Sequence, residues 1–366
     1  MNKIAQLRKG MEKLGLGAFL VTKRENVRWL TGFTADDPST VLITQKRKFF
    51  FVYISSLEQA KEQARGFKVI DISKDGKEKI ERIFSKVNTK YVGFENSIPF
   101  NLLKRFKKLD KRNGRRWKAT RMILEELRMI KTNDEIRNVR KACGLAEEGF
   151  VYIKRKLKFG ITEKEIEWDL EKYMRDRGAD ERSFKFVIGF GPNSARGHHE
   201  SNKRKLCKGD FVLLDFGVKV EGFASDITRT VFFGKPTARQ AEIYDTVLNA
   251  QKEVFKNLKI EMKASELHKI AERYIKKAGK GYELLHGLGH GLGLEIHELP
   301  IIADKKKLKW KIKDFVIAPN MVFTIEPGIY FPGYGGVRIE DDIVMTKRGY
   351  EILTKSPKEL KDIIIK

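Results

Sequence analysis

The first third of the chain alternates between helical and extended spacing of its apolar residues. Residues 4–15 carry apolar side chains every three or four positions, which predicts an amphipathic helix. Short apolar runs predict buried strands at GAFLVT, TVLIT, KFFFVYI, FKVIDIS and KYVGFEN. Between these runs lie two helical patterns, SLEQAKEQARG and KDGKEKIERIFSKV. This interleaving predicts an α/β N-terminal domain with a mixed sheet, which we expect to cover residues 1–118.

Helical spacing dominates the next segment and then gives way to strands. Thr132 and Glu135 form a T-x-x-E capping box before a long amphipathic run, and Thr162 begins a second helix in the same way. After Gly178 the pattern is mostly that of strands. Two further helices are predicted near residues 237–257 and 264–278. Residues 119–366 are therefore predicted to form a larger α+β domain.

Composition narrows the class of protein. The chain has 366 residues, of which 41% are hydrophobic and 34% charged, so two globular domains with their own cores are expected. Its two cysteines, Cys143 and Cys207, exclude a disulfide framework and fit a reducing cytoplasm. The N-terminal segment 1–21 contains no apolar run long enough for a signal peptide or a membrane span. We therefore expect a cytoplasmic protein that does not enter a membrane.

The net charge of +26 raises the question of a polyanionic partner. Basic residues are densest in residues 102–121, where the pattern indicates a solvated helix face. A nucleic-acid patch is the alternative, but the positive charge is spread over the whole chain and no nucleic-acid motif accompanies it. We therefore expect no specific nucleic-acid binding.

Residues 286–300, HGLGHGLGLEIHELP, hold three of the six histidines. The third glycine of a G-x-G-x-x-G dinucleotide fingerprint is missing, and His297-Glu298 lacks the second histidine of an H-E-x-x-H zinc helix. Each glycine destabilises a helix by about 1 kcal/mol relative to alanine, so His286 and His290 are not expected to form a helical pair. An extended strand or a loop is predicted, and a function for His290 requires partners from elsewhere.

Four acids interrupt apolar strand patterns and are candidates for such partners. The run LLDFGVKVEGFASDITRT predicts a β-hairpin that turns near Glu221, with Asp215 on its first strand and Asp226 on the returning one. Glu326 lies in VFTIEPG, and Glu340 lies in VRIEDDIV. Taken one at a time, Glu326 could belong to a turn and Glu340 to a solvated run of charge.

Taken together, the four carboxylates are better explained by a shared cation, because a buried carboxylate without a partner is costly. The imidazole of His290 completes a set of five, which exceeds the four ligands of a structural zinc site. Since carboxylates can bridge, the set predicts two divalent metal ions about 3.5–4 Å apart. Oxygen-rich ligation favours manganese, cobalt, iron or zinc over copper or an iron–sulfur cluster.

The order of the motifs resembles that of a known family. Along the chain follow GPNSARGHH, LLDFGVKVEGFASDITRT, HGLGHGLGLEIHELP, FTIEPGIY and GGVRIEDD. They are similar to the metal and substrate motifs of the proline-specific pita-bread metallopeptidases, relatives of methionine aminopeptidase that include prolidase and Xaa-Pro aminopeptidase. The resemblance extends to ENVRWLTGFT and EELRMIKTNDEIRNVRKA. It implies a pita-bread catalytic domain after a smaller creatinase-like α/β domain, and we expect a homodimer.

The resemblance also implies roles for the five candidate ligands. Asp215 would hold one metal ion with both oxygens, and Asp226 and Glu340 would bridge the two ions. His290 and Glu326 would bind the other ion. Glu326 would also move a proton to or from the attacking hydroxide.

Residues around these ligands receive roles from the same resemblance. His198 and His297 would hydrogen-bond the scissile carbonyl group and the tetrahedral intermediate. Arg338 would orient a metal-binding carboxylate. His286 would pack beside the ligands without binding metal.

The position after H-E-x-P bears on substrate length. Prolidases often carry an arginine there, which suits the free carboxylate of an Xaa-Pro dipeptide, whereas this chain has Ile301. We therefore expect an Xaa-Pro aminopeptidase that takes longer peptides with proline in second position. Xaa-Pro dipeptidase is the alternative, because a lysine of the run 305–307 could replace the arginine. A non-enzymatic clan member that binds nucleic acid or protein is a further alternative, although such members usually lack an intact ligand set.

Overall fold

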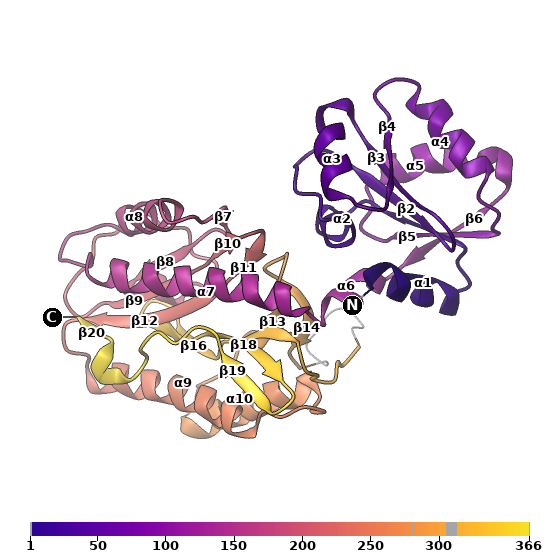
Figure 1. Cartoon of the computed structure of the whole chain (residues 1–366). Helices are drawn as coiled ribbons and strands as arrows, with labels where there is room; N and C mark the ends of the chain where they lie inside the picture. Colours follow the sequence, from indigo (N-terminus) through magenta and orange to yellow (C-terminus); the bar gives the residue numbers. More distant parts are fainter. Residues whose placement is uncertain (1, 280, 305–312, 366) are drawn as a thin grey trace. The chain divides into compact units, whose positions relative to one another are not determined.

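The structure, a computed structural model, describes residues 2–279, 281–304 and 313–365. The lysine run considered above therefore lies outside the described residues. Internal contacts divide the chain into two compact units, Met1–Arg128 and Met129–Lys366 (Figure 1).

The first unit is an α/β domain built on one sheet. Its strands are β1 (Ala18–Val21), β2 (Thr40–Thr44), β3 (Lys48–Val52), β4 (Lys68–Asp71), β5 (Tyr91–Glu95) and β6 (Arg116–Thr120). Its helices are α1 (Lys3–Lys13), α2 (Arg24–Thr31), α3 (Leu57–Gln63), α4 (Gly76–Ser85), α5 (Phe100–Leu109) and α6 (Ile123–Arg128), with 3-10 turns η1 (Ile54–Ser56) and η2 (Lys111–Asn113). The strand order is β4-β3-β2-β1-β5-β6. Because β1 is antiparallel to β2 and parallel to β5, the sheet is mixed, as predicted.

The basic run at 102–121 differs in part from the prediction. Helix α5 ends at Leu109, and β6 then pairs parallel with β5 at the edge of the sheet. The expectation of a helix face is wrong for this second part, where exposed Arg116 and Lys118 alternate with half-buried Trp117 in the two-residue period of an edge strand. The domain boundary expected after residue 118 falls inside β6.

The second unit is α+β. Its helices are α7 (Asn133–Lys154), α8 (Glu163–Arg175), α9 (Ala238–Asn257) and α10 (Ala264–Ala278), with 3-10 turns η3 (Gly191–Ala195) and η4 (Leu360–Asp362). Its strands up to residue 233 are β7 (Glu181–Arg182), β8 (Val187–Phe190), β9 (Phe211–Phe216), β10 (Val218–Val220), β11 (Phe223–Ala224) and β12 (Ile227–Phe233). The later strands are β13 (Gly289–Gly291), β14 (Glu298–Ile302), β15 (Val322–Ile325), β16 (Gly328–Phe331), β17 (Gly335–Arg338), β18 (Asp341–Thr346), β19 (Gly349–Ile352) and β20 (Ile364–Ile365).

Two larger sheets form the centre of this unit, in the orders β20-β12-β9-β8 and β14-β13-β15-β18-β19. Smaller sheets join β11-β10-β7 and β16-β17. Helices α7 and α8 pack on the strands from one side, and α9 and α10 pack from the other (Figure 1). Throughout the described residues, no helix combines the length and the apolar character needed to cross a bilayer.

Local signals explain several of these elements. Thr132 and Thr162 form the predicted capping boxes of α7 and α8. Glu221 and Gly222 connect β10 to β11 with positive φ values of 51° and 72°, which is the geometry of a tight hairpin turn.

The glycine-rich segment is not helical and combines a short strand, β13, with loop, as predicted. Strand β13 runs between β14 and β15. A Cβ atom on Gly289 would lie 2.0 Å from the carbonyl oxygen of Thr324, and one on Gly291 would lie 2.1 Å from that of Leu299. Glycine therefore allows the close approach of neighbouring backbone that carries His290 into the sheet.

Candidate metal centre

The five candidate ligands come from strands or strand ends of the two larger sheets. Asp215 lies in β9, Asp226 immediately precedes β12, His290 lies in β13, Glu326 immediately follows β15, and Glu340 immediately precedes β18. The two sheets meet here, because the backbone N–H of Glu340 donates to the carbonyl of Thr228 in β12 over 3.1 Å. Asp215 therefore lies within a buried apolar strand, whereas the other three acids lie at strand ends and not inside the strands where the sequence pattern placed them.

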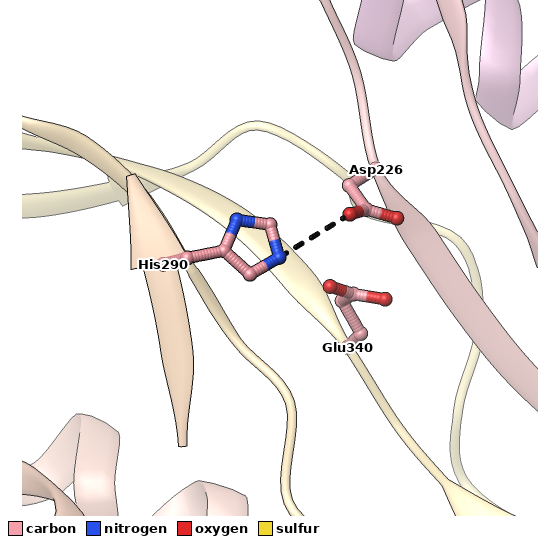
Figure 2. A group of neighbouring side chains, drawn as sticks. All are labelled: Asp226, His290 and Glu340. Carbon is pink, nitrogen blue, oxygen red and sulfur yellow. Dashed lines mark ion pairs between the residues drawn. The ribbon is translucent and has the colours of Figure 1, made fainter. Parts of the chain in front are cut away.

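Three of these residues form a compact group. Asp226, His290 and Glu340 each offer a ligand atom, and these atoms lie within 4.8 Å of one another (Figure 2). His290 Nε2 is 3.6 Å from Asp226 Oδ2 and 3.3 Å from Glu326 Oε1. Ligand atoms that share an ion at about 2.0–2.2 Å lie roughly 3–4 Å apart, so this spacing suits a shared cation.

The electrostatics of the group also favour a cation. Burial, followed by the neighbouring Glu340 and Asp215 carboxylates, raises the pKa of Asp226 well above its ordinary value. Burial raises the pKa of Glu326 to about 8. Within the described part of the chain, the buried Asp226 Oδ1 has no hydrogen-bond partner. A divalent cation would neutralise these charges and coordinate the unpaired oxygen, so the residues fit a metal ion.

His290 has the protonation state that a metal ligand needs. Burial, reinforced by the nearby His297, lowers the pKa of His290 to about 3, so the imidazole is neutral at pH 7. Its Nδ1 lies 3.2 Å from the carbonyl oxygen of Gly291, which assigns the proton to Nδ1. The lone pair of Nε2 is then directed at Asp226 and Glu326, an arrangement typical of metal-binding histidines.

Arg338 connects two of the other ligand candidates. Its guanidinium pairs with Asp215 and donates to Tyr330 Oη over 2.7 Å. It also donates to Thr228 Oγ1 over 3.1 Å, and Thr228 donates to Glu340 Oε2 over 2.5 Å. Arg338 therefore fixes Asp215 directly and Glu340 through one hydroxyl group.

A second threonine supports the other side of the group. Thr324 Oγ1 donates to Glu326 Oε1 over 3.1 Å and accepts from the backbone N–H of His290 over 3.1 Å. Neither threonine is among the residues predicted from the sequence, although a signal for both is present. Thr228 follows Asp226 by two positions and Thr324 precedes Glu326 by two, so each lies on the same face of its strand as the acid.

The acids next to Glu340 are buried as well. Glu340, Asp341 and Asp342 are at most 2% exposed, which excludes a solvated run of charge. Asp342 Oδ2 accepts from the backbone N–H of Asp226 over 2.8 Å and from the thiol of Cys143 over 3.2 Å. No sequence pattern distinguishes this supporting role from that of the neighbouring acids.

The candidate substrate-binding residues surround the group. The rings of His297 and His290 lie 4.3 Å apart, edge to face. Burial is the largest cause of the lowered pKa of His297, and Asp215 and His198 also influence it. His198 is exposed in the loop after η3. Ile301 is the cross-strand partner of His290, so its side chain lies on the same face of the sheet.

Two further histidines have other contacts. The ring nitrogens of His286 contact the Gly287 carbonyl at 2.7 Å and Tyr330 Oη at 2.9 Å, and Tyr330 in turn accepts from Arg338. His199 is buried, with Nε2 2.7 Å from Glu163 Oε2. His199 is therefore held by Glu163 and differs in environment from the exposed His198.

Comparison with known proteins assigns each of the two units to the family that the sequence motifs resemble. Residues 137–347 match metallopeptidase family M24, and residues 3–130 match the creatinase/prolidase N-terminal domain. The Xaa-Pro dipeptidase of Pyrococcus horikoshii is 33% identical over 98% of this chain and 98% of its own length.

Two solved structures extend the similarity to three dimensions. The Xaa-Pro dipeptidase from Bacillus anthracis has a TM-score of 0.92 and 35% identity, with 99% of each chain covered. The X-Pro aminopeptidase from Thermotoga maritima MSB8 has a TM-score of 0.86 and 30% identity, covering 97% of this chain and 100% of that one. These matches confirm the predicted pita-bread fold and hydrolase class, and the chain belongs to metallopeptidase family M24, with a creatinase/prolidase N-terminal domain.

Proposed function

We propose that this protein is an Xaa-Pro dipeptidase that depends on two divalent metal ions. The observation that carries the metallopeptidase reaction is the buried group of Asp226, His290 and Glu340. Relatives at 33–35% identity over nearly the whole chain include Xaa-Pro dipeptidases from Pyrococcus horikoshii and Bacillus anthracis. They favour the dipeptidase alternative over the aminopeptidase that Ile301 alone indicates. The homodimer, the cytoplasmic location and the absence of specific nucleic-acid binding stay predictions.

In this proposal each ligand has a defined role. Asp226 and Glu340 would be shared by the two ions, Asp215 would hold one ion, and His290 and Glu326 would hold the other. When bound, such ions would supply an activated water nucleophile and positive charge that stabilises the reacting carbonyl oxygen. Manganese, cobalt, iron and zinc are the candidate ions.

The remaining steps fall to side chains of this protein. Glu326, in the carboxylate form that a bound metal ion would favour, accepts a proton from the attacking water and returns it to the leaving nitrogen. The bond before proline is a tertiary amide, so this nitrogen has no hydrogen of its own and must receive one to leave. His297 and His198 donate hydrogen bonds to the carbonyl oxygen as it becomes negative, each contributing about 3–4 kcal/mol.

Metal binding is expected to release protons. A carboxyl group with a raised pKa holds its proton below that pKa, so Glu326, at about 8, is mostly protonated at pH 7 in the metal-free protein. The metal binds the carboxylate forms, and the pKa of Asp226 is raised as well, so affinity should increase as the pH rises through about 8. Calorimetric titration with Mn²⁺ at pH 7, in two buffers of different ionisation enthalpy, should give heats that differ by the protons released. Buffer-independent heats would exclude this linkage, and Glu326→Gln should release fewer protons than wild type.

Substrate length tests the choice of dipeptidase. A site that recognises the carboxylate after proline should prefer an Xaa-Pro dipeptide to its C-terminal amide by about tenfold or more in kcat/KM, because a charge-assisted hydrogen bond contributes about 1.5–3 kcal/mol. The same enzyme should cleave an Xaa-Pro-Yaa-Zaa peptide more slowly than the dipeptide.

The Ile301→Arg variant completes this experiment. Ile301 lies on the His290 face of the sheet, so an arginine there should raise the preference for the dipeptide further. A wild type that prefers the longer peptide, and shifts toward the dipeptide only in this variant, would identify an Xaa-Pro aminopeptidase instead.

A further inference from the structure

The two glutamates of the candidate centre are the first and last residues of the segment 326–340, which connects β15 to β18. The place where the two ends of this segment lie side by side is called the neck below. The polypeptide leaves β15 at Ile325, forms the β16–β17 hairpin and returns to β18 at Asp341, the residue with which Ile325 is paired. Glu326 is the first residue of this segment and Glu340 is the last. The width of the neck therefore sets the separation of the two carboxylates.

One side chain of α9 spans this neck. Gln251 is fully buried, and its Nε2 donates to the carbonyl oxygen of Ile325 over 3.0 Å and to that of Ile339 over 3.2 Å. These carbonyls belong to the peptide units that begin Glu326 and Glu340. The two hydrogens of the amide thus join Ile325, the last residue of β15, to Ile339, the residue after β17. Each of these residues immediately precedes one of the two glutamates.

The N–H groups of the same two peptide units are also hydrogen-bonded. The N–H of Glu326 donates to the Leu288 carbonyl over 2.8 Å, and the N–H of Glu340 donates to the Thr228 carbonyl over 3.1 Å. Leu288 lies two residues before His290, and Thr228 lies two residues after Asp226. Gln251 is the common partner on the carbonyl side, so it links the placement of both glutamates.

The orientation of the Gln251 amide is fixed by its neighbours. Its Oε1 accepts from Lys358 Nζ over 2.8 Å, and Lys358 also pairs with Asp341. A flipped amide would turn Nε2 toward the ammonium group and Oε1 toward two carbonyl oxygens, which removes every hydrogen bond. Asp341 pairs with the buried Arg229 over 2.6 Å, so the amide belongs to a fully partnered network.

We propose that Gln251 is a positioning residue that sets the spacing between Glu326 and Glu340 and thereby the affinity for the metal ions. This inference rests on the proposed function, in which both glutamates bind metal. An apolar residue of similar shape would leave the Ile325 and Ile339 carbonyls buried without this donor, so the neck would widen or rearrange.

The test uses Gln251→Met and a matched control on the same helix. Gln240 is also buried in α9, and its Nε2 donates to the carbonyl of Gly209 over 2.8 Å, away from both glutamates. Gln240→Met therefore removes this bond, together with the one that Gln240 Oε1 accepts from the N–H of Thr237 at the start of α9, without touching the neck. The readouts are Mn²⁺ affinity and stoichiometry by calorimetry, together with kcat and KM on an Xaa-Pro dipeptide.

Gln251→Met should weaken Mn²⁺ binding about tenfold or more and lower kcat at a fixed Mn²⁺ concentration, with KM for the dipeptide within twofold of wild type. Gln240→Met should bind Mn²⁺ within twofold of wild type. Wild-type Mn²⁺ affinity in Gln251→Met, or equal losses in the two variants, would overturn the inference. If Gln251→Met does not fold, Gln251→Glu keeps the partner of Lys358 while placing a carboxylate oxygen against the two carbonyls, and the same loss of affinity is expected. A wild type that needs no metal would instead refute the proposed function.

Discussion

Replacing Glu340 with glutamine is expected to lower kcat/KM on an Xaa-Pro dipeptide by about three orders of magnitude, because a metal-assisted step typically owes several kcal/mol to the ion. Glu340 is 2% exposed, and its Oε2 accepts from Thr228. Glutamine keeps the shape but removes the charge and one oxygen, so it cannot bridge two ions. Steady-state kinetics and elemental analysis of the bound metal give the two readouts.

A glutamate elsewhere in the same sheet provides the control. Glu351 lies in β19 and pairs with Arg140 at the surface, where its side chain is 36% exposed. Glu351→Gln should leave kcat/KM within twofold of wild type, since exposed ion pairs contribute little. Asp226→Asn should behave like Glu340→Gln. Near-native turnover with two ions bound in either ligand variant would contradict the ligand assignment.

Removing the buried guanidinium behind the centre is expected to cause the largest loss of stability. Arg229 is fully buried and donates to the carbonyls of Thr354 and Ser356 as well as to Asp341. Arg229→Met leaves those carbonyls short of a donor, and Asp341 keeps only Lys358 and the Thr354 hydroxyl as partners. Breaking a buried pair typically costs 3–5 kcal/mol, and the remaining lysine places the expected loss at about 3 kcal/mol.

Urea denaturation should detect this loss as a lower midpoint of unfolding. The matched control is Arg137→Met, because Arg137 pairs with Asp134 on the surface, with side-chain exposures of 67% and 81%. Its effect should stay within about 0.5 kcal/mol. A native-like midpoint in Arg229→Met would show that the buried network contributes little to stability.

Short-range sequence signals predict most of the helices and strands. The capping boxes at Thr132 and Thr162 and the turn at Glu221 are short-range features, and the structure contains each of them. Helix α2 was missed because its buried face includes Asn26, which donates to Glu95 over 2.7 Å. A polar residue that is satisfied by a distant partner breaks the apolar pattern on which such predictions depend.

The sequence predicts the ligands of the candidate site, because their side chains are unusual in apolar strands, but it does not predict the backbone contacts that hold them. An acid inside an apolar strand stands out, and the grouping of Asp226 with Glu340 follows from the cost of burying each alone. The link from Gln251 to the Ile325 and Ile339 carbonyls could not be predicted, because backbone acceptors leave no mark on the sequence. Ile301 shows that a single position is a weak guide to substrate length. Isoleucine in place of the arginine of prolidases indicates an aminopeptidase, whereas similarity over the whole chain favours a dipeptidase.

The central claim is that Asp226, His290 and Glu340 hold metal ions that cleavage of Xaa-Pro bonds requires. The most direct test removes metal with EDTA, verifies the metal-free state by elemental analysis and measures turnover of an Xaa-Pro dipeptide during titration with Mn²⁺ or Co²⁺. Turnover should be absent without metal, should return as ions bind and should reach its maximum at two ions per chain, whereas Glu340→Gln should not recover. Undiminished turnover in verified metal-free protein would contradict the claim.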